Sequence, residues 1–358
     1  GLCVCWGMGA NNVANAMGTS VGSGAITVRR ALILAAVMEF AGAYLAGGEV
    51  AATISKGIID GKLFEPVPHL LLFAMIGALL AAGVWLIVAS MRGWPVSATH
   101  SIVGAVCGAG IAALGVDAVN WRMMAEIVVS WCISPVLGGI VALALTLSIR
   151  KLILNTGNPI GQARRWGPMY AFLVGWIVSL VTITAGLKHV NVHLGGVDGQ
   201  LLSIAIGIVL ALLVKGRMRR IHLDEGDDRI FHFASVEKLF VPLMILTGAA
   251  MAFAHGSNDV ANGIGPMAVA IQIIETRAVG PGSAVTPFML LLGGIGIAAG
   301  VATYGYKVMA TMGNKITQLT PTRGYAATVA ASIVVVAASG MGLPVSTTHI
   351  AVGSVIGV

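Results

Sequence analysis

Charged residues are scarce in this chain. Asp, Glu, Lys and Arg make up 10% of its 358 residues, while 57% are hydrophobic and the mean hydropathy is +0.92. Soluble domains carry about a quarter charged residues, so an ordinary soluble domain is excluded. Long unbroken apolar runs, instead of alternating ones, exclude a β-barrel. The sequence predicts an all-α polytopic membrane protein with about 10–12 membrane segments, embedded in a lipid bilayer.

Cysteine is also rare. All four cysteines lie in apolar segments, so we expect small hydrophobic side chains and no disulfide framework. They are Cys3, Cys5, Cys107 and Cys132. Cys3 and Cys5 form a C-x-C pair with no neighbouring His or Cys pair to complete a soft-metal site. We expect no cofactor.

The net charge of +7 lies mainly in short loops. One basic loop spans Arg150–Arg165 and another Lys215–Arg220, and two apolar spans separate them. The loop between, Lys188–Asp198, is poor in Lys and Arg. The positive-inside rule therefore places both basic loops in the cytoplasm of a multi-pass protein of the inner or plasma membrane. The positive charge reports topology, and we expect no nucleic-acid partner.

Two motifs occur twice, in the same order. Gly9–Ala16 (GANNVANA) returns as Gly256–Gly263 (GSNDVANG), and Gly93–His100 (GWPVSATH) returns as Gly342–His349 (GLPVSTTH). In an apolar chain, such a duplication favours a transporter whose halves meet around one site. We expect a first repeat over residues 1–115, connecting helices with a charged cytoplasmic loop over 116–238, and a second repeat over 239–358. Because polar backbone is tolerated in a membrane only where protein or a wet cavity covers it, broken or re-entrant helices are expected at the motifs.

The residue types in the motifs suit ion binding. The Asn/Asp copies offer oxygens that can replace the hydration shell of a hard cation. The Pro-Val-Ser copies offer hydroxyls beside the start of a half-helix, which can donate to a tetrahedral oxyanion. No motif copy contains Lys or Arg. Since burying a bare anion is costly, this pattern favours anion transport coupled to a cation or a proton.

Glu39 lies in the middle of an apolar span, where a carboxylate is costly and typically functional. The simplest alignment of the repeats pairs it with Thr286, which is not acidic. The sequence therefore predicts a coupling role for Glu39 that is unequal between the halves. A buried structural hydrogen bond is the alternative.

Both motif pairs closely resemble the signatures of the inorganic phosphate transporter (PiT) family, over essentially the whole chain. The resemblance implies two inverted-topology repeats and a secondary transporter, not an enzyme, that imports phosphate by symport with Na⁺ or H⁺, and the oxygen-rich motifs favour Na⁺. It implies phosphate or cation contacts at Asn11, Asn12, Ser97, Thr99, Asn258, Asp259, Ser346 and Thr348. It implies Na⁺ ligands at Asn12, Asn15, Asp259 and Asn262.

One residue departs from the family signature, which usually has Asp where this chain has Asn12. Asn keeps the size and one oxygen but loses the charge, whereas the second copy retains Asp259. We expect weaker cation coupling through the first half.

Other functions stay open at this point. H⁺ could replace Na⁺, and sulfate could replace phosphate. A channel of the aquaporin kind also pairs two half-helices, but its Asn-Pro-Ala signature is missing here. A membrane enzyme using Ser97 with His100 lacks the Gly-x-Ser-x-Gly elbow. The sequence also leaves open whether the protein forms a homodimer.

Overall fold

The structure is a computed structural model that describes residues 1–94, 96–184, 196–223, 233–280, 285–313 and 319–358. Within these ranges it is almost entirely helical, and its β-structure is one isolated bridge between Ile59 and Val119. This architecture confirms the predicted all-α fold class. The predicted outside loop Lys188–Asp198 lies mostly beyond the described residues.

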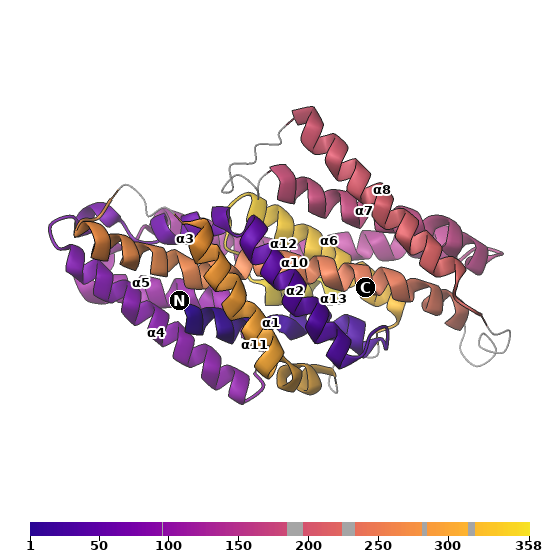
Figure 1. The fold of residues 1–358 in the computed structure, drawn as a ribbon, viewed down its shortest axis with the longest axis horizontal. Helices are drawn as coiled ribbons and strands as arrows, with labels where there is room; N and C mark the ends of the chain where they lie inside the picture. Colours follow the sequence, from indigo (N-terminus) through magenta and orange to yellow (C-terminus); the bar gives the residue numbers. More distant parts are fainter. Residues whose placement is uncertain (95, 185–195, 224–232, 281–284, 314–318) are drawn as a thin grey trace.

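The helices differ in length and follow one another through short connections. In chain order they are α1 (Leu2–Gly22), α2 (Val28–Ala46), α3 (Gly48–Lys56), η1 (Gly61–Phe64), α4 (Pro68–Met91), α5 (Ala98–Leu114), η2 (Val116–Ala118), α6 (Trp121–Ile149), η3 (Arg150–Leu154), α7 (Pro159–Thr184), α8 (Gly196–Arg219), α10 (Ala234–Thr276), α11 (Pro287–Gly313), α12 (Pro321–Gly340) and α13 (Thr347–Ile356). Figure 1 places α10 in the middle of the molecule, among α1, α2 and α12.

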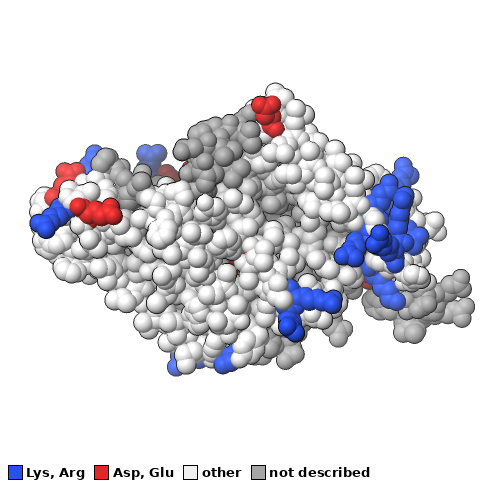
Figure 2. Space-filling view, viewed as in Figure 1, with Lys and Arg blue, Asp and Glu red and all other residues white. Residues whose placement is uncertain are grey.

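Seven of the described helices are long and apolar enough to cross a membrane, and the pair α2 and α3, bent by 65°, has the composition of a broken span or a re-entrant loop. Two shorter apolar helices, α5 and α13, complete the set of helices with this composition. Figure 2 shows a wide uncharged surface, with Lys and Arg gathered over the right-hand ends of α7 and α8. The multi-pass membrane architecture is confirmed.

The two motifs sit on different kinds of backbone. The expectation of broken helices was wrong for the Asn/Asp motifs, because both copies lie inside continuous helices, α1 and α10. Neighbouring helices bury these positions, so their polar side chains need no break in the backbone to be sheltered from lipid. The Pro-Val-Ser copies do precede the half-helices α5 and α13.

Each Pro-Val-Ser motif begins at a glycine with positive φ. Gly93 has φ 65° and Gly342 has φ 71°, in the left-handed region where a side chain is strained. Each glycine follows the end of a long helix, α4 or α12, and turns the chain toward the next half-helix. The duplication in sequence is therefore also a duplication in backbone geometry.

The helices that carry the Asn/Asp motifs pack antiparallel. Gly1 at the start of α1 lies against Met267 near the end of α10, whereas Gly248 near the start of α10 lies against Met17 and Ser20. Opposed directions are what an inverted repeat requires. The predicted domain limits stay a prediction, and the expected boundary at residue 239 falls inside α10, which begins at Ala234.

Two glycine contacts of α1 reappear in α10. A Cβ at Gly9 would overlap the carbonyl of Ile297 on α11, and a Cβ at Gly256 would overlap the carbonyl of Glu39 on α2. Close backbone approach through small residues is the usual basis of helix packing in membranes. Each repeat therefore inserts its motif helix against a helix of the other repeat.

The same close approach recurs one turn away. Gly300 packs against the carbonyl of Trp6, and Gly42 packs against the carbonyl of Phe253. Trp6 and Phe253 each lie three residues before the motif glycine of their own helix. The pairs are reciprocal, so the two repeats pack against each other through equivalent surfaces.

Candidate functional site

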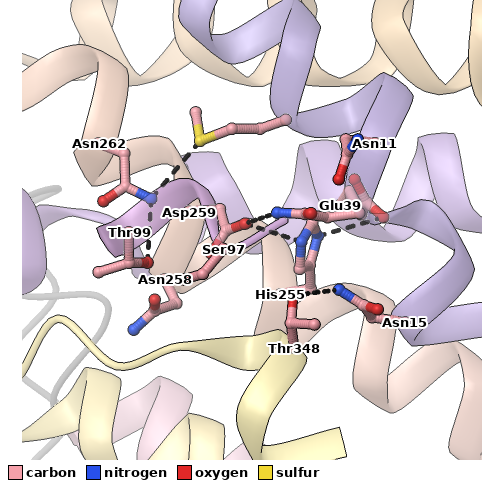
Figure 3. Close-up of polar contacts among 12 residues, drawn as sticks. Asn11, Asn15, Glu39, Ser97, Thr99, His255, Asn258, Asp259, Asn262 and Thr348 are labelled. Atoms are coloured by element: carbon pink, nitrogen blue, oxygen red, sulfur yellow. Dashed lines mark hydrogen bonds and ion pairs between the residues drawn. The ribbon is translucent and has the colours of Figure 1, made fainter. Parts of the chain in front are cut away.

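The four motif copies meet at the centre of the molecule, joined by two hydrogen bonds that cross between the repeats. Asn15 Nδ2 donates to Thr348 Oγ1 at 2.8 Å, and Asn262 Nδ2 donates to Thr99 Oγ1 at 3.3 Å (Figure 3). The first bond joins the first Asn/Asp motif to the second Pro-Val-Ser motif, and the second bond does the converse. The predicted convergence of the motifs is thus seen in the contacts themselves.

The two unmatched motif residues touch each other. Asn12 Nδ2 donates to Asp259 Oδ2 at 2.8 Å, across a sequence separation of 247 residues. Both side chains are about 99% buried. The amide nitrogen must face the carboxylate, because two acceptor oxygens at this distance repel each other. The equivalent positions of the duplication therefore form one direct pair.

His255 links Asp259 to Glu39. Its Nε2 lies 2.8 Å from Asp259 Oδ2, and its Nδ1 lies 3.3 Å from Glu39 Oε1 (Figure 3). All three side chains are almost fully buried. With protons on both ring nitrogens, the imidazolium faces a carboxylate on each side, which is the arrangement that makes a buried charge tolerable.

His255 is absent from the residues predicted to form the site. A usable signal was present in the sequence, because His255 immediately precedes the second Asn/Asp motif and lies four residues before Asp259 on one helical face. The first copy has Met8 at the equivalent position, so a search for residues shared by the two repeats does not find His255. A polar residue in only one copy is itself informative.

The structure also corrects the counterpart of Glu39. The reciprocal glycine contacts pair Gly256 with Glu39 and Gly9 with Ile297, so Ile297 and not Thr286 is the equivalent residue. The alignment failed because a fixed sequence offset ignores insertions between the motif and the next helix. The conclusion that the counterpart is not acidic still holds.

Asn11 and Asn258 hold the chain just before the half-helices. Asn11 Nδ2 donates to the carbonyl of Trp94 at 2.9 Å, and its Oδ1 accepts from the N–H of Val96 at 3.2 Å. Asn258 Nδ2 donates to the carbonyl of Leu343 at 3.4 Å. Both amides also reach a serine, Ser90 or Ser339, respectively, at 3.3 Å. Asn11 thus has hydrogen-bond partners on both its amide atoms.

The two motif serines begin the half-helices. Ser97 Oγ accepts from the N–H of His100 at 3.2 Å, and Ser346 Oγ accepts from the N–H of His349 at 3.3 Å. These are N-cap bonds, which a serine in extended backbone makes at a helix start. The two imidazole rings pack edge to face, with their centroids 4.6 Å apart. The half-helices therefore bring their N-terminal ends close together.

Several buried oxygens at the site have no hydrogen-bond donor. Within the Asn/Asp motifs they are Asn12 Oδ1, Asn258 Oδ1, Asp259 Oδ1 and Asn262 Oδ1, and outside the motifs both carboxylate oxygens of Glu39 also lack a hydrogen bond. A buried acceptor without a donor is costly, and a hard cation satisfies such oxygens. On α10, Asn262 lies four residues after Asn258 and three after Asp259, so it is a neighbour of both on the helix surface. This donor set fits Na⁺, which would be transported cargo.

Two cavities lie near opposite ends of the motif helices. A cavity of about 890 Å³ includes Gly22 at the end of α1 and Glu237 near the start of α10. Another, of about 410 Å³, includes Gln272 near the end of α10 and Leu71 near the start of α4. Neither is lined by a residue of the four motifs. A third, much smaller pocket of about 10 Å³ is lined by Ser257 of the second Asn/Asp motif.

Comparison with known proteins agrees with the motifs. The model of the phosphate transporter family matches residues 8–358. A Haemophilus influenzae relative named "Putative phosphate permease" is 44% identical over 363 residues, covering all of this chain and 85% of that protein. The chloroplastic "Inorganic phosphate transporter 2-1" of Arabidopsis thaliana is 40% identical, covering all of this chain and 64% of that protein.

A solved structure described as "The sodium-dependent phosphate transporter" has the same fold. It superposes with a TM-score of 0.91 and 37% sequence identity, covering 99% of this chain and 86% of that one. Similarity of this extent covers the helices, the motifs and the connecting section alike. The chain belongs to the phosphate transporter family.

Proposed function

We propose that this protein imports inorganic phosphate across the cell membrane by symport with Na⁺. The observation that carries the proposal is the buried cluster in which crossed hydrogen bonds unite all four motif copies around oxygens that lack donors. Family membership supports phosphate as the substrate, and the solved relative described as sodium-dependent supports Na⁺ as the coupled ion.

The half-helices supply the anion side of the proposed site. The N-terminal ends of α5 and α13 approach each other, and each N-terminus carries partial positive charge and N–H groups free of intrahelical partners. Ser97 and Ser346 add hydroxyls, and Thr99 and Thr348 follow within the first turn. In the described conformation, Thr99 Oγ1 donates to the carbonyl of Val345 at 3.0 Å. This bond must open for Thr99 to donate to phosphate.

The amide and carboxylate oxygens supply the cation side. Asn12, Asn15, Asp259 and Asn262 are the proposed Na⁺ ligands, and three of them carry an oxygen without a donor. A cation at these oxygens provides the counter-charge that the motifs lack, because they contain no Lys or Arg. Binding of the anion and of the cation then favour each other, which is the basis of symport.

Glu39 acts in this proposal through His255. It lies beyond His255 as seen from Asp259, so it orients the imidazole and balances its charge. The imidazole in turn fixes one oxygen of Asp259 and leaves the other for a cation. Glu39 is therefore a positioning residue for coupling.

The reciprocal contacts and the antiparallel motif helices support two inverted-topology repeats. In such transporters, one repeat moves against the other around a fixed site. The four motifs line neither of the two end cavities, which supports an occluded state from which each cavity can become an entrance. The basic residues at the end of α6, the start of α7 and the end of α8 support a cytoplasmic position for these helix ends.

Uptake of labelled phosphate into proteoliposomes tests the proposal. With an inward Na⁺ gradient, we expect saturable uptake that excess unlabelled phosphate inhibits and sulfate does not. A choline gradient of equal osmolarity is the control. Uptake that ignores both Na⁺ and pH gradients would contradict symport.

H⁺ coupling is the second candidate, because Glu39, His255 and Asp259 form a continuous row of ionisable groups. The same proteoliposomes distinguish it. An inward pH gradient without Na⁺ would then drive uptake, and Na⁺ alone would not.

A further inference from the structure

The contact between Asn12 and Asp259 constrains how many cations the site needs. Their side chains meet at 2.8 Å, at equivalent positions of the two motif copies. Were both residues carboxylates in this geometry, two negative oxygens would face each other in a buried setting. Such a pair requires a shared proton or a bridging cation. The Asn12 amide instead bridges the pair with its own N–H.

The residues around the Asn12–Asp259 pair also differ in charge between its two sides. On one side, Asp259 has His255 and Glu39 as partners. On the other side, the equivalent residues are Met8 and Ile297, which are apolar. Negative charge at these positions is therefore confined to the side where Glu39 of α2 packs on α10, and the side where Ile297 of α11 packs on α1 is apolar. A hard cation is held most strongly where oxygens carry charge.

The buried oxygens that lack a hydrogen-bond donor also differ between the two motif copies. Asp259 Oδ1 is the charged one, and Asn258 and Asn262 add neutral oxygens on α10. In the first repeat, Asn12 Oδ1 lacks a donor, whereas Asn11 Oδ1 accepts from Val96 N–H. The first copy thus offers fewer fully buried oxygens without a donor, and it carries no charge.

We propose that the Asn12 amide takes the place of one coupled cation, so that this chain has a single strong Na⁺ position, on the α10 side of the Asn12–Asp259 pair. The inference rests on the proposed Na⁺ symport and specifies its cation side. Asn12→Asp creates a second strong position, because the added carboxylate faces Asp259 and needs a cation between them.

Equilibrium binding of labelled Na⁺ to purified protein in detergent, with saturating phosphate, measures this directly. Asn12→Asp is expected to bind about one more Na⁺ per chain than the unaltered protein, since each facing carboxylate calls for counter-charge. Asp259→Asn is expected to lose strong binding. The matched control is Asn158→Asp, which adds the same charge at an exposed asparagine outside the site.

Thermal unfolding gives a readout that does not depend on transport. The melting temperature of Asn12→Asp should rise more steeply with Na⁺ concentration than that of the unaltered protein, whereas Asn158→Asp should follow the unaltered protein. The exchanged double variant Asn12→Asp with Asp259→Asn restores one carboxylate and one amide. We expect it to regain Na⁺ binding lost in Asp259→Asn.

The outcomes separate the two proposals. Absence of Na⁺ binding to the unaltered protein would sink Na⁺ symport itself. Binding to the unaltered protein with an unchanged count and an unchanged Na⁺ dependence of melting in Asn12→Asp would overturn the single-position inference and leave symport standing. If Asp259→Asn does not fold, the Asn12→Asp count and the melting series still decide the question.

Discussion

The two halves of the site share their backbone contacts and differ in their charges. Gly9 and Gly256 pack against opposing carbonyls in the same manner, and the amides of Asn15 and Asn262 cross to equivalent threonines. By contrast, Glu39 and His255 correspond to Ile297 and Met8. The duplication therefore preserves the packing that holds the repeats together and leaves the ionisable groups free to diverge.

This difference assigns separate roles to the two classes of residue. Packing must match on both sides, because each repeat clasps the other through the same surface. Charge needs no such match, since one carboxylate between the repeats serves both. We expect substitutions in packing residues to have equal effects in both halves and substitutions in charged residues to have unequal ones.

The largest effect is expected for His255→Met, which gives the second half the residue of the first. It leaves Glu39 and Asp259 buried without their shared partner, at a cost of about 3–5 kcal/mol in folding free energy. Phosphate uptake should be lost. The double variant Glu39→Ile with His255→Met should regain part of that stability, because Ile297 and Met8 show that this packing suits the apolar pair. Chemical denaturation in detergent measures the stability of the single and the double variant. Equal stabilities of the two variants would contradict the idea that His255 balances the charge of Glu39.

The next effect tests the packing class. Gly9→Ala and Gly256→Ala each place a Cβ against a backbone carbonyl, and overpacking of this kind costs about 1–3 kcal/mol. We expect the two losses of melting temperature to agree closely. Gly104→Ala on α5 is the control, because a Cβ there meets nothing within 4 Å. A large loss of melting temperature in one variant and none in the other would show that the two glycine contacts are not equivalent.

The helix starts should respond less. Ser97→Ala and Ser346→Ala each remove an N-cap acceptor, worth about 1 kcal/mol. Because the caps are alike, we expect similar losses of stability from both. We also expect a several-fold rise in the phosphate concentration for half-maximal uptake, since both hydroxyls face the proposed anion site. Thr156→Ala, at a half-buried bend outside the site, is the control for uptake.

Much of this arrangement is legible in the sequence. The duplicated motifs and the scarcity of charge predict the helical fold and the meeting of the two halves around one site. The sequence does not predict that α1 and α10 are continuous at the motifs. Their polar residues are sheltered from lipid by neighbouring helices, and local composition does not reveal those neighbours. His255 is missed because it has no repeat partner. Pairing Glu39 with Ile297 needs the backbone contacts, which no fixed offset reveals.

The smallest expected effect decides whether the halves also differ in the crossed amides. Interhelical hydrogen bonds in membranes contribute about 0.6 kcal/mol. A double-mutant cycle of Asn15→Ala with Thr348→Val measures one bond, at 2.8 Å, and Asn262→Ala with Thr99→Val measures the other, at 3.3 Å. Without Na⁺, we expect the shorter bond to show the larger coupling. Added Na⁺ should raise the coupling of Asn262 with Thr99 above the other, because the charged oxygen of Asp259 draws the cation to that side. If Na⁺ strengthens only the bond between Asn15 and Thr348, the cation binds in the first half, and the first copy of the Asn/Asp motif is then the main cation site.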